Sequence, residues 1–211
     1  MKVKIKICGI TNKEDFLLAS DLGAEFLGFI FYPKSPRHTG NKLKELLSLE
    51  TSAKKVVVFV NPEFEDVKKA LDYGADFIQL HGEEAPSFAK KIGLNRVIKA
   101  FRVKDSLPDL SDWKGIFAVL FDTYVKGKPG GTGKRFNWDV IKPVLSNENF
   151  RVFLAGGINP DNVLEAVKLN PFAIDVSSGV EKSPGKKDPE KLKLLFERIY
   201  KGHPAPEINI R

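Results

Sequence analysis

Continuous apolar runs of strand length recur along the chain, and amphipathic segments separate them. The runs are rich in Val, Ile and Phe and occupy residues 3–8, 26–31, 56–60, 77–80, 97–101, 117–121, 152–155 and 173–176. A strand that is apolar on both faces is typical of a parallel sheet whose two sides are both covered. The pattern therefore predicts buried parallel strands that alternate with helices.

Local signals predict where several of these helices begin. The segment TNKE at residues 11–14 has the spacing of a capping box, with Thr11 as the cap. Asn61-Pro62 and Asp188-Pro189 each place a capping residue before a proline at the first helical position. These signals fall between the apolar runs, as an alternation of strand and helix requires.

An internal repeat sets the size of the strand–helix unit. The segment DLGAEF at residues 21–26 recurs as DYGADF at residues 72–77, and in both copies a glycine can end a helix in the left-handed conformation. One further strand lies between the copies, so each unit takes about 25 residues and the chain holds about eight. We therefore predict a single (β/α)8 TIM barrel over residues 1–211, with 202–211 as a C-terminal tail. An open doubly wound sheet is the alternative.

Composition excludes several classes of protein. Of the 211 residues, 42% are hydrophobic and 29% charged, so the chain is neither disordered nor collagenous. No apolar run is long enough to cross a membrane, and the start MKVKIK lacks the apolar stretch of a signal peptide. The single cysteine excludes an intramolecular disulfide and a cysteine-based metal site. We expect a cytoplasmic protein with no membrane partner.

The net charge of +7 admits either a nucleic acid or a small anion as the ligand. The basic residues are scattered in pairs along the chain, and no basic arm or basic–aromatic motif stands out. We therefore expect no nucleic-acid partner. A phosphate or carboxylate in a small molecule is the better match to this charge.

In a barrel of this kind, function belongs to the loops that follow the carboxyl ends of the strands. Cys8 ends the first strand, where positive charge and helix N–H groups can stabilise a thiolate, although a buried structural thiol is the commoner role. Asp122 ends the sixth strand and is either a half-buried acid or a cap of the next loop. Arg37 offers a planar fork for a carboxylate, or else is an exposed loop charge. His81 is as compatible with a structural role as with a catalytic one.

The loops after the last two strands fit a phosphate site. Gly156 and Gly157 follow the seventh strand, and the segment DVSSG at residues 175–179 closes the eighth. These residues expose backbone N–H groups and hydroxyls to an anion, at the place where barrels usually bind phosphate. Alternatively, the glycines serve only to make tight turns.

Blocks along nearly the whole chain resemble, in order, the signature segments of the phosphoribosylanthranilate isomerase family. They are KICGIT at 6–11, GFIFYPKSPR at 28–37, QLHG at 79–82, FDT at 121–123, GGTGKRF at 130–136, AGGI at 155–158 and DVSSGVE at 175–181. The tail at 202–211 matches none of them.

The resemblance implies a (β/α)8 barrel enzyme of tryptophan biosynthesis that needs no metal or cofactor. Its reaction would be the Amadori rearrangement of N-(5′-phosphoribosyl)anthranilate to 1-(2-carboxyphenylamino)-1-deoxyribulose 5-phosphate. By resemblance, Asp122 is the catalytic acid, Cys8 the base and Arg37 the ligand of the anthranilate carboxylate. The residues that the resemblance assigns to the phosphate end or to supporting polar contacts are Gly133, Gly156, Gly157, Ser177, Ser178, Gly179, His81 and Asp175.

Two other functions remain open at this point. Another phosphate-binding barrel would lack the combination of Cys8 and Asp122. A non-catalytic binding protein would keep the basic charge but show no isomerase turnover. For the enzyme we expect a monomer or a homodimer.

Overall fold

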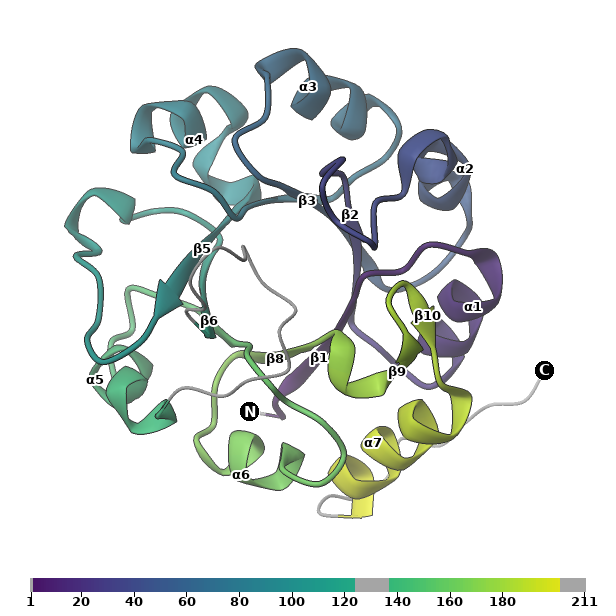
Figure 1. Ribbon diagram of the computed structural model, residues 1–211. Coiled ribbons are helices and arrows are strands. Elements are labelled where there is room, and N and C mark those ends of the chain that lie inside the picture. The colour runs from purple at the N-terminus through teal and green to yellow at the C-terminus, as the bar shows by residue number, and fades with distance from the viewer. Residues whose placement is uncertain (1, 124–136, 202–211) are drawn as a thin grey trace.

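Eight parallel strands close into a barrel in the computed structural model, which describes residues 2–123 and 137–201 (Figure 1). Each strand pairs with the next in the chain, and β1 pairs with β8, which excludes the open sheet and confirms the predicted barrel. The strands are β1 (Lys4–Cys8), β2 (Phe26–Ile30), β3 (Lys54–Phe59), β4 (Phe77–Leu80), β5 (Val97–Val103), β6 (Ala118–Thr123), β7 (Val152–Leu154) and β8 (Ala173–Val176).

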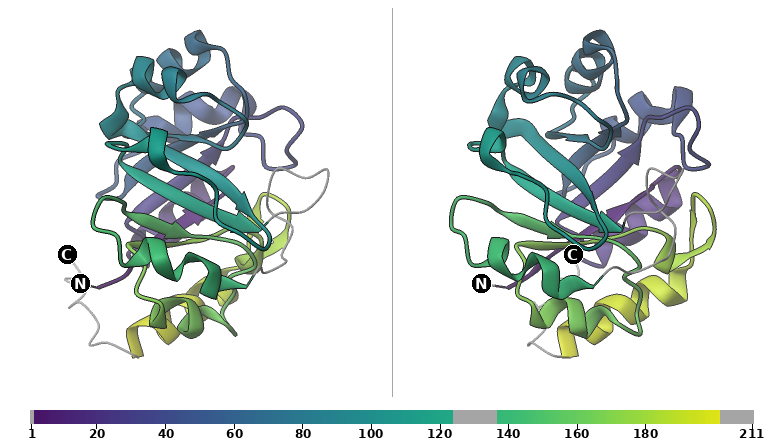
Figure 2. Two further views of the ribbon diagram at one scale, coloured as in Figure 1. Left: turned by 90° about the vertical axis from the view of Figure 1, so that its left-hand side faces the viewer. Right: turned by 60° about the vertical axis from the view of Figure 1, so that its left-hand side comes forward.

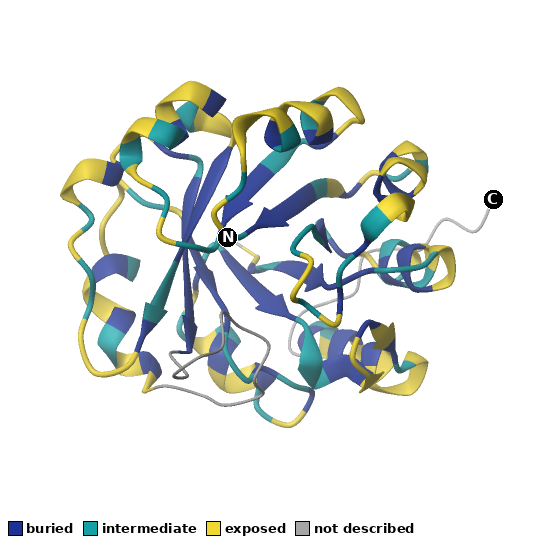
Figure 3. Cartoon of the chain, turned by 45° about the horizontal axis from the view of Figure 1, so that its top comes forward, coloured by how far each residue is buried: buried dark blue, intermediate teal, exposed yellow. Residues whose placement is uncertain are grey.

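Helices surround the barrel, with their exposed faces turned outward and the buried strands inside (Figures 2 and 3). The α-helices are α1 (Lys13–Asp21), α2 (Leu43–Ser48), α3 (Phe64–Asp72), α4 (Pro86–Ile92), α5 (Lys142–Leu145), α6 (Val163–Lys168) and α7 (Pro189–Lys201). Short 3-10 helices are η1 (Gly40–Lys42), η2 (Leu94–Arg96), η3 (Ser111–Trp113), η4 (Trp138–Ile141) and η5 (Ser178–Val180). Within the described residues, no helix is long and apolar enough to cross a membrane.

Side chains alternate between two cores along each strand. The outer core lies between the strands and the helices and includes Ile5 and Ile7 of β1. The inner core fills the barrel and takes the alternate residues of the strands, such as Val56, Leu120 and Ala173. Because successive side chains of a strand point to opposite faces, the apolar runs of the sequence supply both cores.

Phenylalanines close the amino-terminal end of the barrel. Phe26, the first residue of β2, has its ring centroid between 5.1 and 6.4 Å from those of Phe77, Phe117, Phe153 and Phe172. These four residues stand at or near the starts of β4, β6, β7 and β8. The cluster forms a floor that excludes water from that end, so polar chemistry is confined to the other end.

Two of the predicted helix starts are wrong, and each has a local reason. Asn12, not Thr11, caps α1 and accepts the N–H of Asp15, while the Thr11 hydroxyl donates to the carbonyl of Gly185. Asn61 does not cap α3, because it adopts a left-handed φ of 47° and its side chain accepts the N–H of Glu83. The cap at Asp188 is confirmed by bonds from the N–H groups of Glu190 and Lys191.

An antiparallel hairpin follows β8 and was not predicted. Its strands are β9 (Glu181–Ser183) and β10 (Lys186–Lys187), and Figure 1 shows it beside β1 and α1. Its residues are mostly charged, so it carries no apolar run of the kind that marks the barrel strands. The hairpin lies at the carboxyl end of β1, where Lys187 donates to the carbonyl of Cys8.

Phe26→Ala should lower the free energy of unfolding by about 3–5 kcal/mol, because it leaves a cavity among four aromatic rings. Denaturant unfolding followed by circular dichroism measures this change. Leu17→Ala, at a side chain that is 42% exposed on α1, serves as the control and should cost less than about 0.5 kcal/mol. Equal losses in the two variants would contradict the proposed floor of the barrel.

Candidate active site at the carboxyl ends of the strands

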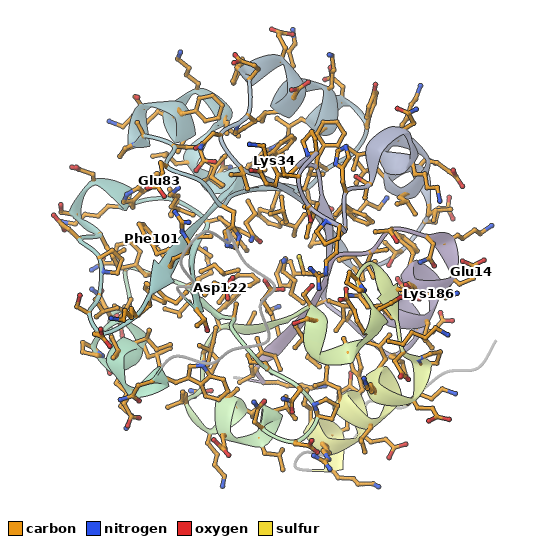
Figure 4. The ribbon with its side chains drawn as sticks, in the orientation of Figure 1. Glu14, Lys34, Glu83, Phe101, Asp122 and Lys186 are labelled. Carbon is orange, nitrogen blue, oxygen red and sulfur yellow. The ribbon has the colours of Figure 1, made fainter. Side chains whose placement is uncertain are left out.

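Polar side chains replace apolar ones where the strands reach the carboxyl end of the barrel. Cys8 ends β1, Asp122 lies next to the last residue of β6, and Asp175 lies in β8; all three are buried. His81 directly follows β4 and is partly buried. Figure 4 places Asp122 inside the ring of strands. The fold thus brings these four predicted residues to the same end of the barrel.

Asp122 and His81 face each other at this end. The Nε2 atom of His81 is 3.5 Å from Oδ2 of Asp122, which is longer than a strong hydrogen bond. Nε2 of Gln79 forms a hydrogen bond of 3.0 Å with Nδ1 of His81, which holds the ring with its other nitrogen toward Asp122. The other carboxylate oxygen of Asp122 accepts the N–H of Thr123 at 2.7 Å. Oδ2 therefore keeps capacity for a bound molecule.

A buried ion pair fixes the loop that carries His81. Glu84 accepts the N–H groups of Gly82 at 3.0 Å and of Asn61 at 2.8 Å, and Lys99 binds the same carboxylate at 2.7 Å. A Cβ at Gly82 would lie 2.3 Å from Oδ1 of Asn61, so only glycine fits there. These contacts explain why the QLHG segment ends in glycine.

Cys8 lies among charged groups. Across the strand pairs, Cys8 is level with Gly28 of β2, and Lys6, two residues earlier on β1, is level with Asp175 of β8. Nζ of Lys6 is 3.0 Å from Oδ1 of Asp175, and both groups are buried. Burial raises the pKa of the Cys8 thiol, and the positive charge of Lys6 opposes this increase without cancelling it. The resting form at neutral pH is therefore the thiol, and not the thiolate that the sequence left open as one of two possibilities.

Arg37 is buried and engages a carboxylate of the protein itself. Its Nε atom donates to Glu181 Oε1 at 2.9 Å, and its Nη2 atom donates to Oε2 at 2.7 Å. This side-on pairing occupies one edge of the guanidinium. The Nη1 atom takes no part in it, so the edge formed by Nη1 and Nη2 can still receive a second carboxylate. The sequence alternative of an exposed loop charge is wrong.

Glu181 and Lys187 were missed as functional-site residues. Nζ of Lys187 is 2.9 Å from Oε1 of Glu181 and also donates to the carbonyls of Cys8 and Ser177. Burial disfavours the Glu181 carboxylate, but the hydrogen bonds from Arg37 and the charge of Lys187 outweigh it and hold its pKa below the ordinary range. Glu181 stands in the DVSSGVE block, which is the signal that could have found it. No feature of the sequence predicts the role of Lys187, because the pair Lys186-Lys187 is typical of a solvated surface.

The predicted phosphate loops pack against each other. Gly156 and Gly157 have left-handed φ angles of 91° and 69°, and a Cβ at Gly179 would lie 2.0 Å from the carbonyl oxygen of Ile158. Ser178 and Gly179 form the single turn η5, and the buried hydroxyl oxygen of Ser177 has no hydrogen-bond partner among the described residues. Gly133 and the rest of the segment GGTGKRF at residues 130–136 lie outside the described residues. In the described part of the chain, no group of three or more His, Cys, Asp or Glu side chains could hold a metal ion.

Comparison with known proteins identifies the family. A family model described as N-(5′-phosphoribosyl)anthranilate (PRA) isomerase matches residues 5–198. The chain belongs to this family. The N-(5′-phosphoribosyl)anthranilate isomerase of Aquifex aeolicus is 48% identical over 200 residues, which cover 93% of this chain and 98% of that protein.

Two solved structures of phosphoribosylanthranilate isomerases share the barrel. Monomers derived from the dimeric enzyme of Thermotoga maritima align with a TM-score of 0.79 and 37% identity, covering 95% of this chain and all of that one. A second isomerase, solved with reduced 1-(o-carboxyphenylamino)-1-deoxyribulose 5-phosphate, aligns with a TM-score of 0.77 and 36% identity over 95% of this chain and 100% of that one. The isomerase fold and family inferred from the sequence are therefore confirmed.

Glu181→Gln should lower the free energy of unfolding at pH 7 by about 3 kcal/mol, because it leaves two buried cations without their carboxylate. A carboxylate whose folded pKa is lowered stabilises the protein above its unfolded pKa of about 4.3, and this contribution is lost as the pH falls. The variant should therefore lose less stability than the wild type on acidification below about pH 5. Denaturant unfolding at several pH values measures both effects.

Glu50→Gln, at an exposed position, is the matched control and should leave the pH dependence of unfolding unchanged. A Glu181→Gln variant as stable as the wild type at pH 7 would contradict the network that we describe around Arg37.

Proposed function

We propose that Asp122 and Cys8 are the acid and the base with which this phosphoribosylanthranilate isomerase acts. The enzyme converts N-(5′-phosphoribosyl)anthranilate, an aminoaldose, into the corresponding 1-deoxyribulose 5-phosphate, an aminoketose, in tryptophan biosynthesis. The observation that carries the proposal is the burial of both side chains at the same end of the barrel. They come from β1 and β6, which β7 and β8 separate, so a substrate between them would be reached from two sides.

In this proposal, Asp122 opens the furanose ring. An acid must protonate the ring oxygen, so that the bond from this oxygen to C1 breaks and the anthranilate nitrogen and C1 form an iminium. Oδ2 of Asp122 has capacity for this contact, since Nε2 of His81 is 3.5 Å away, too far for a strong hydrogen bond. His81 can hold the carboxyl group in place and stabilise the carboxylate that remains after the proton has left.

In this proposal, Cys8 removes the proton from C2 of the iminium. The electron pair of the broken C–H bond then neutralises the nitrogen and yields an enolamine, and tautomerisation of the enolamine gives the ketone. A thiolate is needed for this step, although burial raises the pKa of Cys8 and favours the thiol in the free enzyme. The positive charge of the iminium, when it forms beside Cys8, lowers the pKa of the thiol, so that the thiol proton passes to solvent before the proton of C2 is removed.

The two ends of the substrate match two further parts of the site. The free edge of Arg37 suits the planar carboxylate of the anthranilate group, to which it can donate two parallel hydrogen bonds. The phosphate suits the loops after β7 and β8. There Gly157, Ser178 and Gly179 offer backbone N–H groups, and the Ser177 hydroxyl, which has no partner within residues 2–123 and 137–201, is close by. Binding energy from both ends would hold the sugar between acid and base.

We also propose a cytoplasmic enzyme, consistent with a pathway that consumes a phosphorylated sugar. It would work as a monomer or a homodimer, and the similar enzyme of T. maritima is described as dimeric.

Cys8→Ser and Asp122→Asn should each lower kcat by about 10²–10⁴-fold, because each removes one positioned proton-transfer group and keeps nearly the same shape. Both variants should still bind a non-reactive product analogue and unfold at nearly the wild-type temperature. Steady-state kinetics, analogue binding and thermal unfolding of the two variants test this. If kcat of Cys8→Ser were close to that of the wild type, Cys8 would not be the base.

Inorganic phosphate should inhibit competitively against the substrate, because it would occupy the paired loops. Ser178→Asp, which brings a negative charge to these loops, should raise both KM and the inhibition constant for phosphate by about tenfold or more, while kcat changes little. Substituting the exposed Ser111 by Asp is the control. An inhibition constant unaffected by Ser178→Asp would place the phosphate elsewhere.

A further inference from the structure

Lys6 is a buried polar side chain for which neither the family comparison nor the mechanism above supplies a role. It is fully buried inside the barrel, with an exposed fraction of 0%. A lysine at such a place is costly for folding unless its charge is compensated. Asp175 supplies that compensation at 3.0 Å. A buried apolar pair would stabilise the barrel at least as well, so stability alone does not explain this ion pair.

The position of Lys6 relative to Cys8 follows from the strand geometry. Residues two apart on a strand share a face, so Lys6 and Cys8 both point into the barrel from β1. On the neighbouring strand β2 they face Gly28, where a Cβ would lie 2.7 Å from Sγ of Cys8 and 3.0 Å from Nζ of Lys6. The absence of a side chain at Gly28 therefore leaves one space that the thiol and the ammonium share.

We propose that Lys6 is a positioning residue for proton abstraction: its ammonium group, held by Asp175, binds the Cys8 thiol and stabilises the thiolate that removes the substrate proton. The inference rests on the proposed role of Cys8 as the base. In the resting state Lys6 and Asp175 neutralise each other beside a neutral thiol. When the thiolate forms, the ammonium is already in place to donate a hydrogen bond to it, so no rearrangement of the site is needed.

The charges around the thiol agree with this assignment. In the described part of the chain, the groups that act on it are Lys6 on β1, Asp175 on β8 and Lys187 on β10. The ammonium of Lys187 donates to the backbone carbonyl of Cys8 and to the carboxylate of Glu181, and its charge opposes the rise in the thiol pKa less than the charge of Lys6 does. The pKa of Lys6 is raised, because Asp175 and Cys8 together outweigh its desolvation, and Lys6 therefore keeps its proton throughout the pH range of the reaction.

The single cysteine allows a direct test. The ultraviolet absorbance of the thiolate, with the Cys8→Ser variant as the blank for tyrosine, reports the ionisation of Cys8 alone. Lys6→Met should raise the apparent pKa of the thiol by about one unit or more, whereas Asp175→Asn should lower it, because a negative charge near the sulfur is removed. Shifts in opposite directions from the two members of one ion pair are an electrostatic signature, and loss of packing would not produce them.

The kinetic readout separates positioning from substrate binding. In Lys6→Met, kcat should fall by about tenfold or more at pH 7, and KM should stay within about threefold of the wild-type value. The difference in kcat between the variant and the wild type should become smaller as the pH rises, because the thiol of the variant ionises at higher pH. Lys4→Met is the matched control, because it removes the same charge from the same strand. Lys4 is two residues further from Cys8 than Lys6 is, and its ammonium lies over the ring of Phe172 in the floor of the barrel. In Lys4→Met, the pKa of the Cys8 thiol and the pH profile of kcat should be those of the wild type.

A third variant controls for destabilisation of the fold by an unpaired buried charge. Lys6→Met combined with Asp175→Asn leaves no unpaired buried charge, and its thiol pKa should lie above the wild-type value but below that of Lys6→Met alone. The proposal is overturned if the thiol pKa and the pH profile of kcat are unchanged when Lys6 is replaced. In that case an inactive Cys8→Ser variant would still support Cys8 as the base, whereas an active one would refute the base and this proposal together.

Discussion

The closure of eight strands in a fixed register is the constraint on which the rest of this structure depends. Register determines which residues of each strand face the interior, and it sets Lys6 level with Asp175 and Cys8 level with Gly28. Moving one strand by a single residue would exchange its inward and outward side chains and dismantle both the inner core and the site. The geometry of the site and the packing of the core therefore both follow from the same strand pairing. The phenylalanine floor and the polar site lie at opposite ends of one barrel.

Buried charges at the polar end are compensated in local groups. Lys6 is paired with Asp175, Glu84 with Lys99, and Glu181 with both Arg37 and Lys187. Each group lets a charged side chain remain in a region of low dielectric constant, where its influence on a neighbouring thiol or substrate is stronger than in water. The hairpin β9–β10 takes part in this arrangement, since it carries Glu181 and Lys187 to the end of β1. Stability and chemistry are therefore linked through the same ion pairs.

The sequence predicts the barrel well, because continuous apolar runs of strand length are typical of buried parallel strands and because the repeat fixes their number. It also places Cys8, His81, Asp122 and Asp175 correctly at the ends of strands. It does not predict that Lys6 and Lys187 are buried, because lysine is among the residues most often exposed, and only three-dimensional pairing reveals the exception. The predicted helix caps at Thr11 and Asn61 are wrong for a related reason. Both residues form hydrogen bonds with residues distant in the chain instead of capping their own helices.

A crystal structure with the reduced product analogue tests most directly whether acid and base act from two sides of the sugar. We expect Sγ of Cys8 to lie within about 3.5 Å of C2, or of the hydroxyl oxygen that C2 carries in the analogue. The carboxyl group of Asp122 should lie within hydrogen-bond distance of the oxygen derived from the ring. The carboxylate should lie on Arg37 and the phosphate at Gly157 and Ser178. An analogue bound with C2 away from Cys8, or with both reacting atoms on the side of Asp122, would contradict the account.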